Sequence, residues 1–261
     1  MKTTRILAAA AMLASSSAAF AGTPDFEIAP APVTAPAGSG WEFELSLYAP
    51  LMGQDGKTGL GPVFADVDIS LSEILDHLDG IFSGAFLARY DRWSITGDLI
   101  WIKLSDASFP TNRSYAGLKM EQYMGSLNLG YEIFRNDSTT LEMIGGAAVT
   151  SLDVDVDLFT PSLPVTRRYA SGSETWVDPI VGLRVRHKLS ERWSLFATGV
   201  YGGFGVASDE YWQALAGVGY RLTEHATLAL AYRAISVDYS DGGFLYDTKT
   251  SGPNLGLVFN F

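Results

Sequence analysis

The sequence has no cysteine among its 261 residues. Disulfide bonds, thiolate metal sites and a cysteine-linked lipid anchor are therefore excluded. Beyond the first 21 residues, no apolar run reaches the ~18 uncharged residues that a membrane-spanning helix needs. The chain is thus not expected to be a helical inner-membrane protein.

Basic side chains are scarce, since 18 Lys and Arg stand against 29 Asp and Glu. Without Lys2 and Arg5, the balance is 16 basic against 29 acidic side chains, a net charge of −13. Nucleic acids select for basic surfaces, so we exclude them as partners. The acidic balance is compatible with binding cations or with a well-solvated surface.

The N-terminal residues carry the features of a secretory signal peptide. Lys2 and Arg5 precede a short apolar run, and an Ala-x-Ala site ends at Ala21. The run is shorter than the ~20 residues that span a bilayer as a helix. We therefore expect residues 1–21 to be a cleaved signal peptide, and a buried N-terminal helix is the alternative.

Residues 22–40 contain four prolines among Ala, Gly, Ser and Thr. Such a segment cannot bury a core, and we expect it to be a flexible periplasmic lead. Residues 41–261 are then enough for one large all-β domain.

Apolar and polar residues alternate through most of residues 41–261, which is typical of β-strands because successive side chains point to opposite faces. One example is the alternation of Trp41, Phe43, Leu45 and Leu47 with Glu42, Glu44, Ser46 and Tyr48. Similar alternation is found around Trp93, Tyr123, Val177, Trp212 and Leu255.

Soluble sandwiches alternate as well, but two further features favour a membrane barrel. Many alternating segments run for 10–16 residues, whereas soluble strands average about 5–6. Aromatic residues also gather near segment ends, as they do at membrane interfaces. Because lipid offers no hydrogen bonds to the backbone, a membrane-spanning sheet must close into a barrel.

Connection lengths predict the order of the strands. Short connections lie at 91–92, 135–138, 190–192 and 223–226, and longer ones near 52–79, 106–117, 154–174 and 240–252, with 205–209 as a short exception. Short periplasmic turns and long outer loops are typical of outer-membrane barrels. The predicted hairpins are 41–51 with 80–91, 93–105 with 118–134, 139–153 with 175–189, 193–204 with 209–222, and 227–239 with 252–261.

These five hairpins make a closed antiparallel transmembrane β-barrel of ten strands with both ends in the periplasm. Eight or twelve strands are the alternatives, because residues 61–70 also have a strand pattern. Trp93 and Trp193 each follow a short turn, and together with Trp41 they are expected to anchor the periplasmic interface.

The last eight residues, Asn254-x-Gly256-x-x-Phe259-x-Phe261, resemble the terminal signal that the barrel-assembly machinery recognises in outer-membrane proteins. Together with the signal peptide, this makes the chain similar to small Gram-negative barrels of the outer-membrane-protein-A or outer-membrane-protein-W type. The resemblance implies a location in the outer membrane, with its lipid and the assembly machinery as partners. It implies no function, because barrels serve as pores, adhesins, enzymes and structural proteins.

Charges of both signs fall on the face that would line the barrel. They are Glu42, Glu44, Arg89, Asp98, Glu132, Glu142, Asp178, Arg184, Arg186, Arg221 and Arg233. A ten-stranded barrel is narrow, so these charges must be paired or solvated. One hypothesis is a salt-bridged structural core, and the other is a polar pore whose charges select solutes.

The predicted connection 52–79 contains a helical pattern. Ser70 and Ser72 are alternative N-caps, and Gly80 is expected to end the helix. Its apolar face is formed by Leu71, Ile74, Leu75 and Leu78. Two placements are considered: a plug in or across the barrel mouth, and an external loop helix.

Asp153, Asp155 and Asp157 repeat at strand spacing and are expected to face one way. Clusters of carboxylate oxygens can hold calcium, but the glycine turn and the distal glutamate of a calcium loop are missing here. A solvated acidic rim is therefore the favoured interpretation, and we assign no metal-binding residues.

Catalysis is not expected from this sequence. Ten-stranded outer-membrane proteases use paired acids with an Asp-x-His motif near the outer rim, and this chain has Asp-x-Asp but no Asp-x-His. No Ser and His have a spacing that indicates an outer-membrane lipase. We assign no catalytic and no cofactor-binding residues.

Two hypotheses of function follow. One is a narrow porin-like channel for ions or small solutes. The other is a structural or surface-interaction barrel whose lumen is blocked by side chains or by a loop. The outer segments 106–117 and 240–252, rich in Ser, Thr, Tyr and Gly, would suit the second hypothesis.

Overall fold

The computed structural model describes residues 40–61, 63–110, 115–159 and 167–261. The predicted signal peptide and all but the last residue of the predicted lead lie outside these residues.

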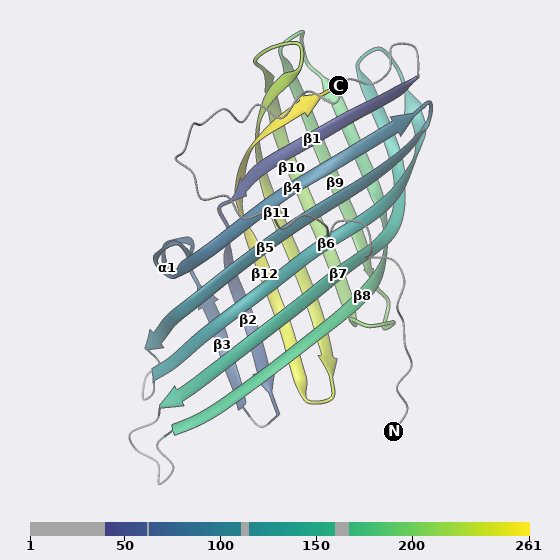
Figure 1. Ribbon diagram of the computed structural model, residues 1–261. Coiled ribbons are helices and arrows are strands. Elements are labelled where there is room, and N and C mark those ends of the chain that lie inside the picture. The colour runs from purple at the N-terminus through teal and green to yellow at the C-terminus, as the bar shows by residue number, and fades with distance from the viewer. Residues whose placement is uncertain (1–39, 62, 111–114, 160–166) are drawn as a thin grey trace, which may run out of the picture. The chain divides into compact units, whose positions relative to one another are not determined.

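Ten strands form a closed antiparallel barrel (Figure 1). They are β1 (Trp41–Pro50), β4 (Leu78–Tyr90), β5 (Trp93–Pro110), β6 (Tyr115–Arg135), β7 (Thr139–Phe159), β8 (Arg167–Lys188), β9 (Trp193–Gly203), β10 (Glu210–Arg221), β11 (Ala226–Asp241) and β12 (Phe244–Asn260). Each strand pairs with the next in this order, and β1 pairs with β12 to close the barrel. The predicted barrel of five hairpins is therefore confirmed.

An additional hairpin extends the sheet, formed by β2 (Gly53–Leu60) and β3 (Val63–Ile69). One strand, β12, pairs with β1 along residues 254–260 and with β2 along residues 244–251. As a result, β1 and β2 follow one another along the same edge of β12. Within the described part of the chain, β3 pairs only with β2.

A short helix, α1 (Leu71–Asp76), connects β3 to β4 beside the barrel wall (Figure 1). Ser70 is its N-cap and forms a capping box with Glu73. The prediction that Gly80 ends the helix is wrong. His77 caps it, and Leu78 pairs at once with Leu104, so that Gly80 already belongs to β4.

The predicted apolar face of α1 is only partly used. Ile74 is buried and joins the apolar core, whereas Leu75 is 53% exposed. The backbone oxygen of His77 accepts a hydrogen bond from the N–H of Ser105 on β5 (3.1 Å). The helix is thus fixed to the wall and contributes one buried side chain to the interior.

The predicted long connections at 154–174 and 240–252 are wrong, because strand pairing continues through most of them. β7 and β8 remain in register out to the Phe159–Arg167 pair. Gly242 and Gly243, with φ of 56° and 91°, form the whole turn between β11 and β12. Positive φ favours glycine and permits this tight hairpin. The predicted connection 106–117 is also largely strand, since β5 continues to Pro110 and β6 begins at Tyr115.

The barrel has two halves that differ in side-chain chemistry. The terminal half contains the start of β1, the end of β12 and the β4–β5, β6–β7, β8–β9 and β10–β11 turns. The loop half contains the β5–β6, β7–β8 and β11–β12 connections. In the terminal half, apolar residues such as Leu127 and Met143 are exposed on the outside, while Glu142 is buried inside. In the loop half, Leu152 and Tyr246 are buried inside, while Asp153 is exposed outside.

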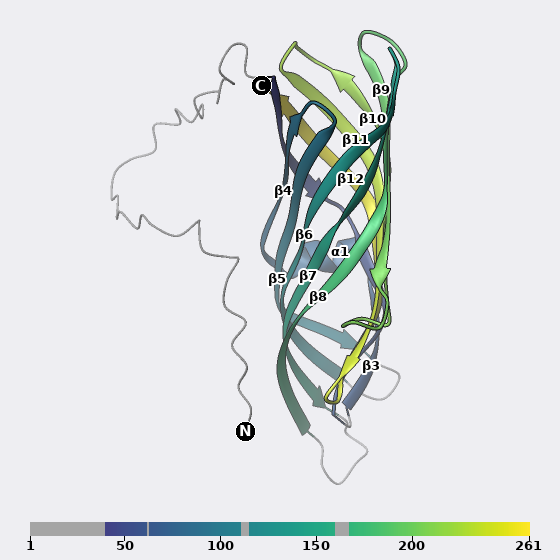
Figure 2. The same cartoon turned by 90° about the vertical axis from the view of Figure 1, so that its right-hand side faces the viewer.

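The loop half is built as two packed sheets, as Figure 2 shows. One sheet consists of the ends of β5–β8, and the other of the ends of β11 and β12 with β2 and β3. Trp176 on β8 stacks on Tyr239 on β11, with ring centroids 4.0 Å apart and planes 3° from parallel. The inner faces of both sheets supply the apolar core, which is the organisation of a β-sandwich.

Candidate functional site

The terminal half of the lumen contains a cavity of 690 Å³. Small-molecule sites commonly have volumes of roughly 300–1,000 Å³. The cavity reaches the short turns through Asn136, Ser138 and Lys188, and its walls deeper in the barrel include Asp98 and Arg233. Its position makes it a vestibule that leads inward from the terminal end.

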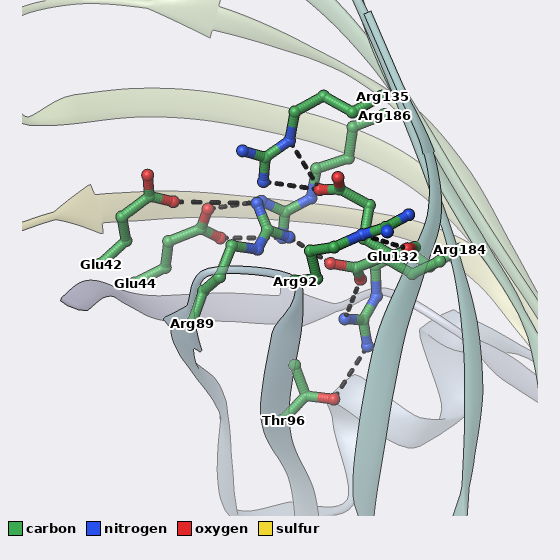
Figure 3. A network of polar contacts seen from close by, with 10 residues as sticks. Glu42, Glu44, Arg89, Arg92, Thr96, Glu132, Arg135, Arg184 and Arg186 are labelled. Carbon is green, nitrogen blue, oxygen red and sulfur yellow. Dashed lines mark hydrogen bonds and ion pairs between the residues drawn. The ribbon is translucent and has the colours of Figure 1, made fainter. Parts of the chain in front are cut away.

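A buried ion-pair cluster is centred on Glu142 of β7 (Figure 3). Arg89 of β4 and Arg184 of β8 both donate to this carboxylate, the latter at 3.0 Å. Arg184 also donates to the hydroxyl of Thr96 (2.8 Å). Because Glu142 is only 2% exposed, these two arginines replace the water contacts that its carboxylate loses on burial.

A second ion pair crosses the lumen from β8 to β1. Arg186 donates from both terminal nitrogens to the carboxylate of Glu44, with the Nη2–Oε2 distance at 2.9 Å. Glu42 lies further out, 3.8 Å from a nitrogen of Arg89. Strands β1 and β8 are not neighbours in the sheet, so the Arg186–Glu44 pair narrows the vestibule from opposite walls.

The terminal end of β6 carries a third pair. Arg135 donates to the buried carboxylate of Glu132 at 2.8 Å from Nε. Arg92 donates to the backbone oxygen of Glu132 (3.1 Å) and lies over the ring of Tyr131. These contacts tie the β4–β5 turn to β6 (Figure 3).

A polar cluster lies deeper in the cavity, where Arg233 of β11 meets β1, β5 and β10. Arg233 donates to Asp98, to the hydroxyl of Tyr48 (2.9 Å) and to Gln213 (2.8 Å). Tyr48 in turn donates to Asp98 (2.8 Å). The four side chains form a connected layer across the barrel.

The lumen becomes apolar beyond this layer. Leu104 and Leu152 are 1% exposed and Tyr246 is 2% exposed. The hydroxyl of Tyr246 accepts hydrogen bonds from Gln54 (3.0 Å) and Gln122 (2.5 Å), so this buried hydroxyl has partners within the protein. The vestibule therefore ends against packed side chains.

Two predicted lumen charges lie outside these clusters. Asp178 is buried and accepts from the backbone N–H (2.8 Å) and the hydroxyl (2.7 Å) of Ser208, which fixes the β9–β10 turn. Arg221 is exposed at the terminal end of β10 and lines the mouth of the vestibule. The other nine form the ion pairs and polar layer described above, and solute selection by them stays a prediction.

The predicted interface tryptophans lie at the terminal end, and each is next to a tyrosine of a neighbouring strand. The pairs are Trp41 with Tyr90, Trp93 with Tyr131 and Trp193 with Tyr220, with ring centroids 5.1, 4.8 and 4.9 Å apart. Aromatic girdles of this kind are typical of membrane interfaces.

The residues of the predicted assembly signal lie on β12 and at its end. Phe261 exchanges two backbone hydrogen bonds with Phe43, of 3.0 and 3.4 Å, where the barrel closes. A side chain at Gly256 would come within 2.8 Å of the Cβ atom of Tyr48. Asn254 is buried and Phe259 is half-buried. These positions support closure of the barrel, and recognition by the assembly machinery stays a prediction.

Asp153, Asp155 and Asp157 lie on the outer face of β7. Asp155 accepts a hydrogen bond from the hydroxyl of Tyr169 (2.8 Å). Among residues 40–61, 63–110, 115–159 and 167–261, no three His, Cys, Asp or Glu side chains are grouped as for a metal ion. No helix in the same ranges is long and apolar enough to cross a membrane, a finding that does not concern strands.

Tyr48, Gln213 and Ser208 were not among the residues predicted for the site. Tyr48 could have been found, because it alternates in phase with Glu42 and Glu44 on the charged face of β1. No local signal marks Ser208, because its partner Asp178 lies 30 residues away.

Known structures show that the chain has the fold of outer-membrane β-barrels. It resembles the outer membrane protease OmpT from Escherichia coli with a TM-score of 0.56 and 13% identity, covering 88% of this chain and 99% of that chain. Weaker matches are neisserial surface protein A (TM-score 0.32, 14% identity, 85% and 98% covered) and Ail, the attachment invasion locus protein of Yersinia pestis (0.32, 12%, 85% and 99%). No known protein family and no curated protein matches the sequence.

Proposed function

We propose that this protein is a closed outer-membrane barrel that presents its loop half as a surface for interaction with other molecules, and that it is not a passive channel. The observation that carries the proposal is the apolar core of the loop half, in which Leu104, Leu152 and Tyr246 are almost completely buried. A solute leaving the vestibule would have to displace these packed side chains.

The polar layer below this core also opposes passive transport. Asp98, Arg233 and Tyr48 are bonded to one another across the lumen. A dissolved ion would have to break these contacts and then enter a region without water, which is unfavourable for a charge. The vestibule is therefore a closed-ended cavity in this proposal.

The outer face of the loop half suits molecular recognition. It carries exposed polar residues, among them Lys119, Asp153 and Ser173, on paired strands. A rigid scaffold that presents polar groups to water loses little conformational entropy when it binds. Outer-membrane lipid around the terminal half and the barrel-assembly machinery complete the proposed partners.

Single-channel recording tests the proposal. Folded protein, identified by a gel mobility that changes on boiling, is expected to give no stepwise conductance in a planar bilayer. A variant lacking residues 53–76 removes β2, β3 and α1 from one sheet of the sandwich. If it folds by the same criterion, it is the control that should conduct. Stepwise conductance of the wild-type protein would overturn the proposal in favour of a channel.

A further inference from the structure

Strand β8 has a free edge in the loop half. It pairs with β9 only from Ile180, opposite Gly202, to Lys188. From Arg167 to Pro179, β8 has β7 on one side and no strand of the described chain on the other. The cause is the shortness of the β9–β10 hairpin: β9 pairs with β8 only as far as Ile180, and β10 pairs with β11 only as far as Asp238. The interruption of strand pairing between β8 and β11 is called the notch.

Backbone hydrogen bonds show which residues of β8 face this notch. The N–H of Lys188 donates to Ser138 on the β7 side (2.7 Å), and the N–H of Leu189 donates to Trp193 on the β9 side (2.9 Å). The β7–β8 register continues without a shift to Phe159–Arg167. Since backbone direction alternates along an antiparallel strand, odd-numbered residues present their N–H and C=O groups to the free edge.

Between Tyr169 and Thr175 the outward face of the free edge carries no charged side chain. Tyr169, Ser171, Ser173 and Thr175 are all exposed. The seven residues from 169 to 175 extend about 23 Å at about 3.3 Å each. Natural proteins usually block such edges with charges, proline or bulges. Pro179 blocks only the end of the free edge that adjoins β9, next to the last β8–β9 pair at Ile180.

Strand β3, another edge strand of the loop half, differs in this respect. Outward residues Asp66 and Asp68 on β3 are exposed and charged. Charges on an edge strand oppose the addition of another strand. The unblocked edge of β8 is therefore the better template.

The opposite side of the notch is acidic. Asp238 of β11 lies between Glu210 of β10 and Asp247 of β12 in the register of the sheet. All three are exposed, as is Asp209 in the β9–β10 turn. The stacked rings of Trp176 and Tyr239 join the two sides of the notch. Within the described residues, the buried indole N–H of Trp176 has no hydrogen-bond acceptor.

We infer that the free edge of β8 binds an extended, basic segment of another protein by strand addition. This inference rests on the proposed surface-interaction function and names its partner. Main-chain hydrogen bonds to Ser171, Ser173 and their odd-numbered neighbours provide the affinity, and the acidic side of the notch selects lysine and arginine.

Antiparallel pairing of the β8 edges of two copies in one membrane is excluded by symmetry. Two copies in one membrane are related by an axis along the membrane normal. Antiparallel pairing of two β8 edges requires an axis perpendicular to the sheet, which would lie in the membrane plane. The two requirements are incompatible.

The test uses full-length folded protein in detergent and a short fluorescent peptide of alternating lysine and valine. The peptide is expected to bind, and Ser173→Pro to weaken binding at least about tenfold, because an edge N–H is lost and the edge is sterically blocked. Ser173→Ala, which keeps the backbone, is the matched control and should bind as the wild type does. Equal binding by Ser173→Pro and the wild type would overturn the inference.

Two further probes keep the test decisive if Ser173→Pro does not fold. A peptide N-methylated at every residue has no N–H group to donate to the ladder and should not bind, and a glutamate–valine peptide should bind more weakly than the lysine–valine peptide. Equal binding of either probe would also overturn the inference. If the peptide tests fail and the wild-type protein gives no conductance, the strand-addition inference is wrong and the closed barrel remains supported. Stepwise conductance of the wild-type protein would instead overturn the proposed function itself.

Discussion

In the terminal half of this barrel, apolar side chains point outward and charged side chains point inward, whereas in the loop half the two faces exchange character. The change occurs within single strands. On β11, Leu230 and Tyr232 are exposed outside in the terminal half, while Val237 and Tyr239 are buried inside in the loop half. The backbone continues unchanged, so the difference reflects what surrounds each half.

The two halves are therefore stabilised differently. Outside the terminal half, the exposed apolar band fits lipid, and the interior charges must be compensated by partners such as Arg89 and Glu142. The polar outer face of the loop half is suited to water, and its interior is packed with apolar side chains as the core of a soluble sandwich is. One sheet thus places its apolar residues outside in one half and inside in the other, because the alternation of apolar and polar residues along its strands changes phase between the halves.

The largest expected effect comes from the aromatic core of the loop half. Trp176→Ala should lower the free energy of unfolding by about 3–5 kcal/mol, because it removes a buried aromatic ring and leaves a cavity. Denaturant unfolding in lipid vesicles measures this. Trp93→Ala at the exposed interface is the control, and an equal loss there would contradict the assignment of a packed core to the loop half.

The terminal half should respond most to loss of a buried charge. Glu142→Gln removes the carboxylate that Arg184 and Arg89 share, leaving Arg184 without its ion-pair partner and Arg89 with only the more distant Glu42 (3.8 Å). It should lower the free energy of unfolding by about 3 kcal/mol. Glu191 lies in an exposed turn and pairs only with Lys188 among the described residues. Glu191→Gln should therefore have a much smaller effect in the same unfolding experiment, and similar losses would show that the lumen is well solvated at Glu142.

Cysteine labelling compares the two interiors directly, because the chain has no cysteine of its own. Thr198→Cys in the vestibule wall should react with a charged thiol reagent at least about tenfold faster than Leu152→Cys in the apolar core, since the reacting thiolate needs water. Equal rates in folded protein would mean that water passes through the loop half.

The smallest expected effect concerns helix α1, which connects β3 to β4 in the loop half. Ser70→Ala removes the N-cap and should make local opening of α1 easier by about 1 kcal/mol. Hydrogen exchange of the Ile74 amide, which bonds to Ser70 O (3.0 Å), reports this opening. Unchanged exchange would show that contacts with the wall, and not the cap, hold the helix.

The same helix should also respond to pH. Hydrogen bonds from Ser70 hold the pKa of Glu73 below its ordinary value. The carboxylate therefore contributes its full stabilisation above the ordinary pKa of about 4.3 and loses it as the pH falls through the lower folded pKa. Glu73→Gln can keep the capping box. In this variant, the protection of the Ile74 amide relative to an unfolded chain should lose this dependence on pH.

Much of the fold could be predicted from local patterns. The ten barrel strands follow from alternation, and the capped helix follows from Ser70 and the apolar residues after it. The lengths of the connections could not be predicted as well, because polar outward residues such as Asp155 and Asp247 interrupt the apolar pattern and favour loops in the sequence. They lie on β7 and β12, which continue through these residues with a polar outer face.

The candidate site was predicted as a set of charges but not as a set of contacts. Glu142 and Arg184 are directly paired in the β7–β8 register, yet Arg186 meets Glu44 from a strand that is not its neighbour. Pairing across a lumen depends on the curvature of the closed sheet, which no single segment encodes.

The sequence by itself determined the strands, the chemistry of the outward band and the inward position of the charges, because side-chain alternation is local to each strand. Only the tertiary structure decided that the loop half closes as a sandwich, that the vestibule ends against a core, and that β8 keeps a free edge. These features depend on how far neighbouring strands extend relative to one another, and the physical reason is that pairing and burial are satisfied between segments distant in the chain.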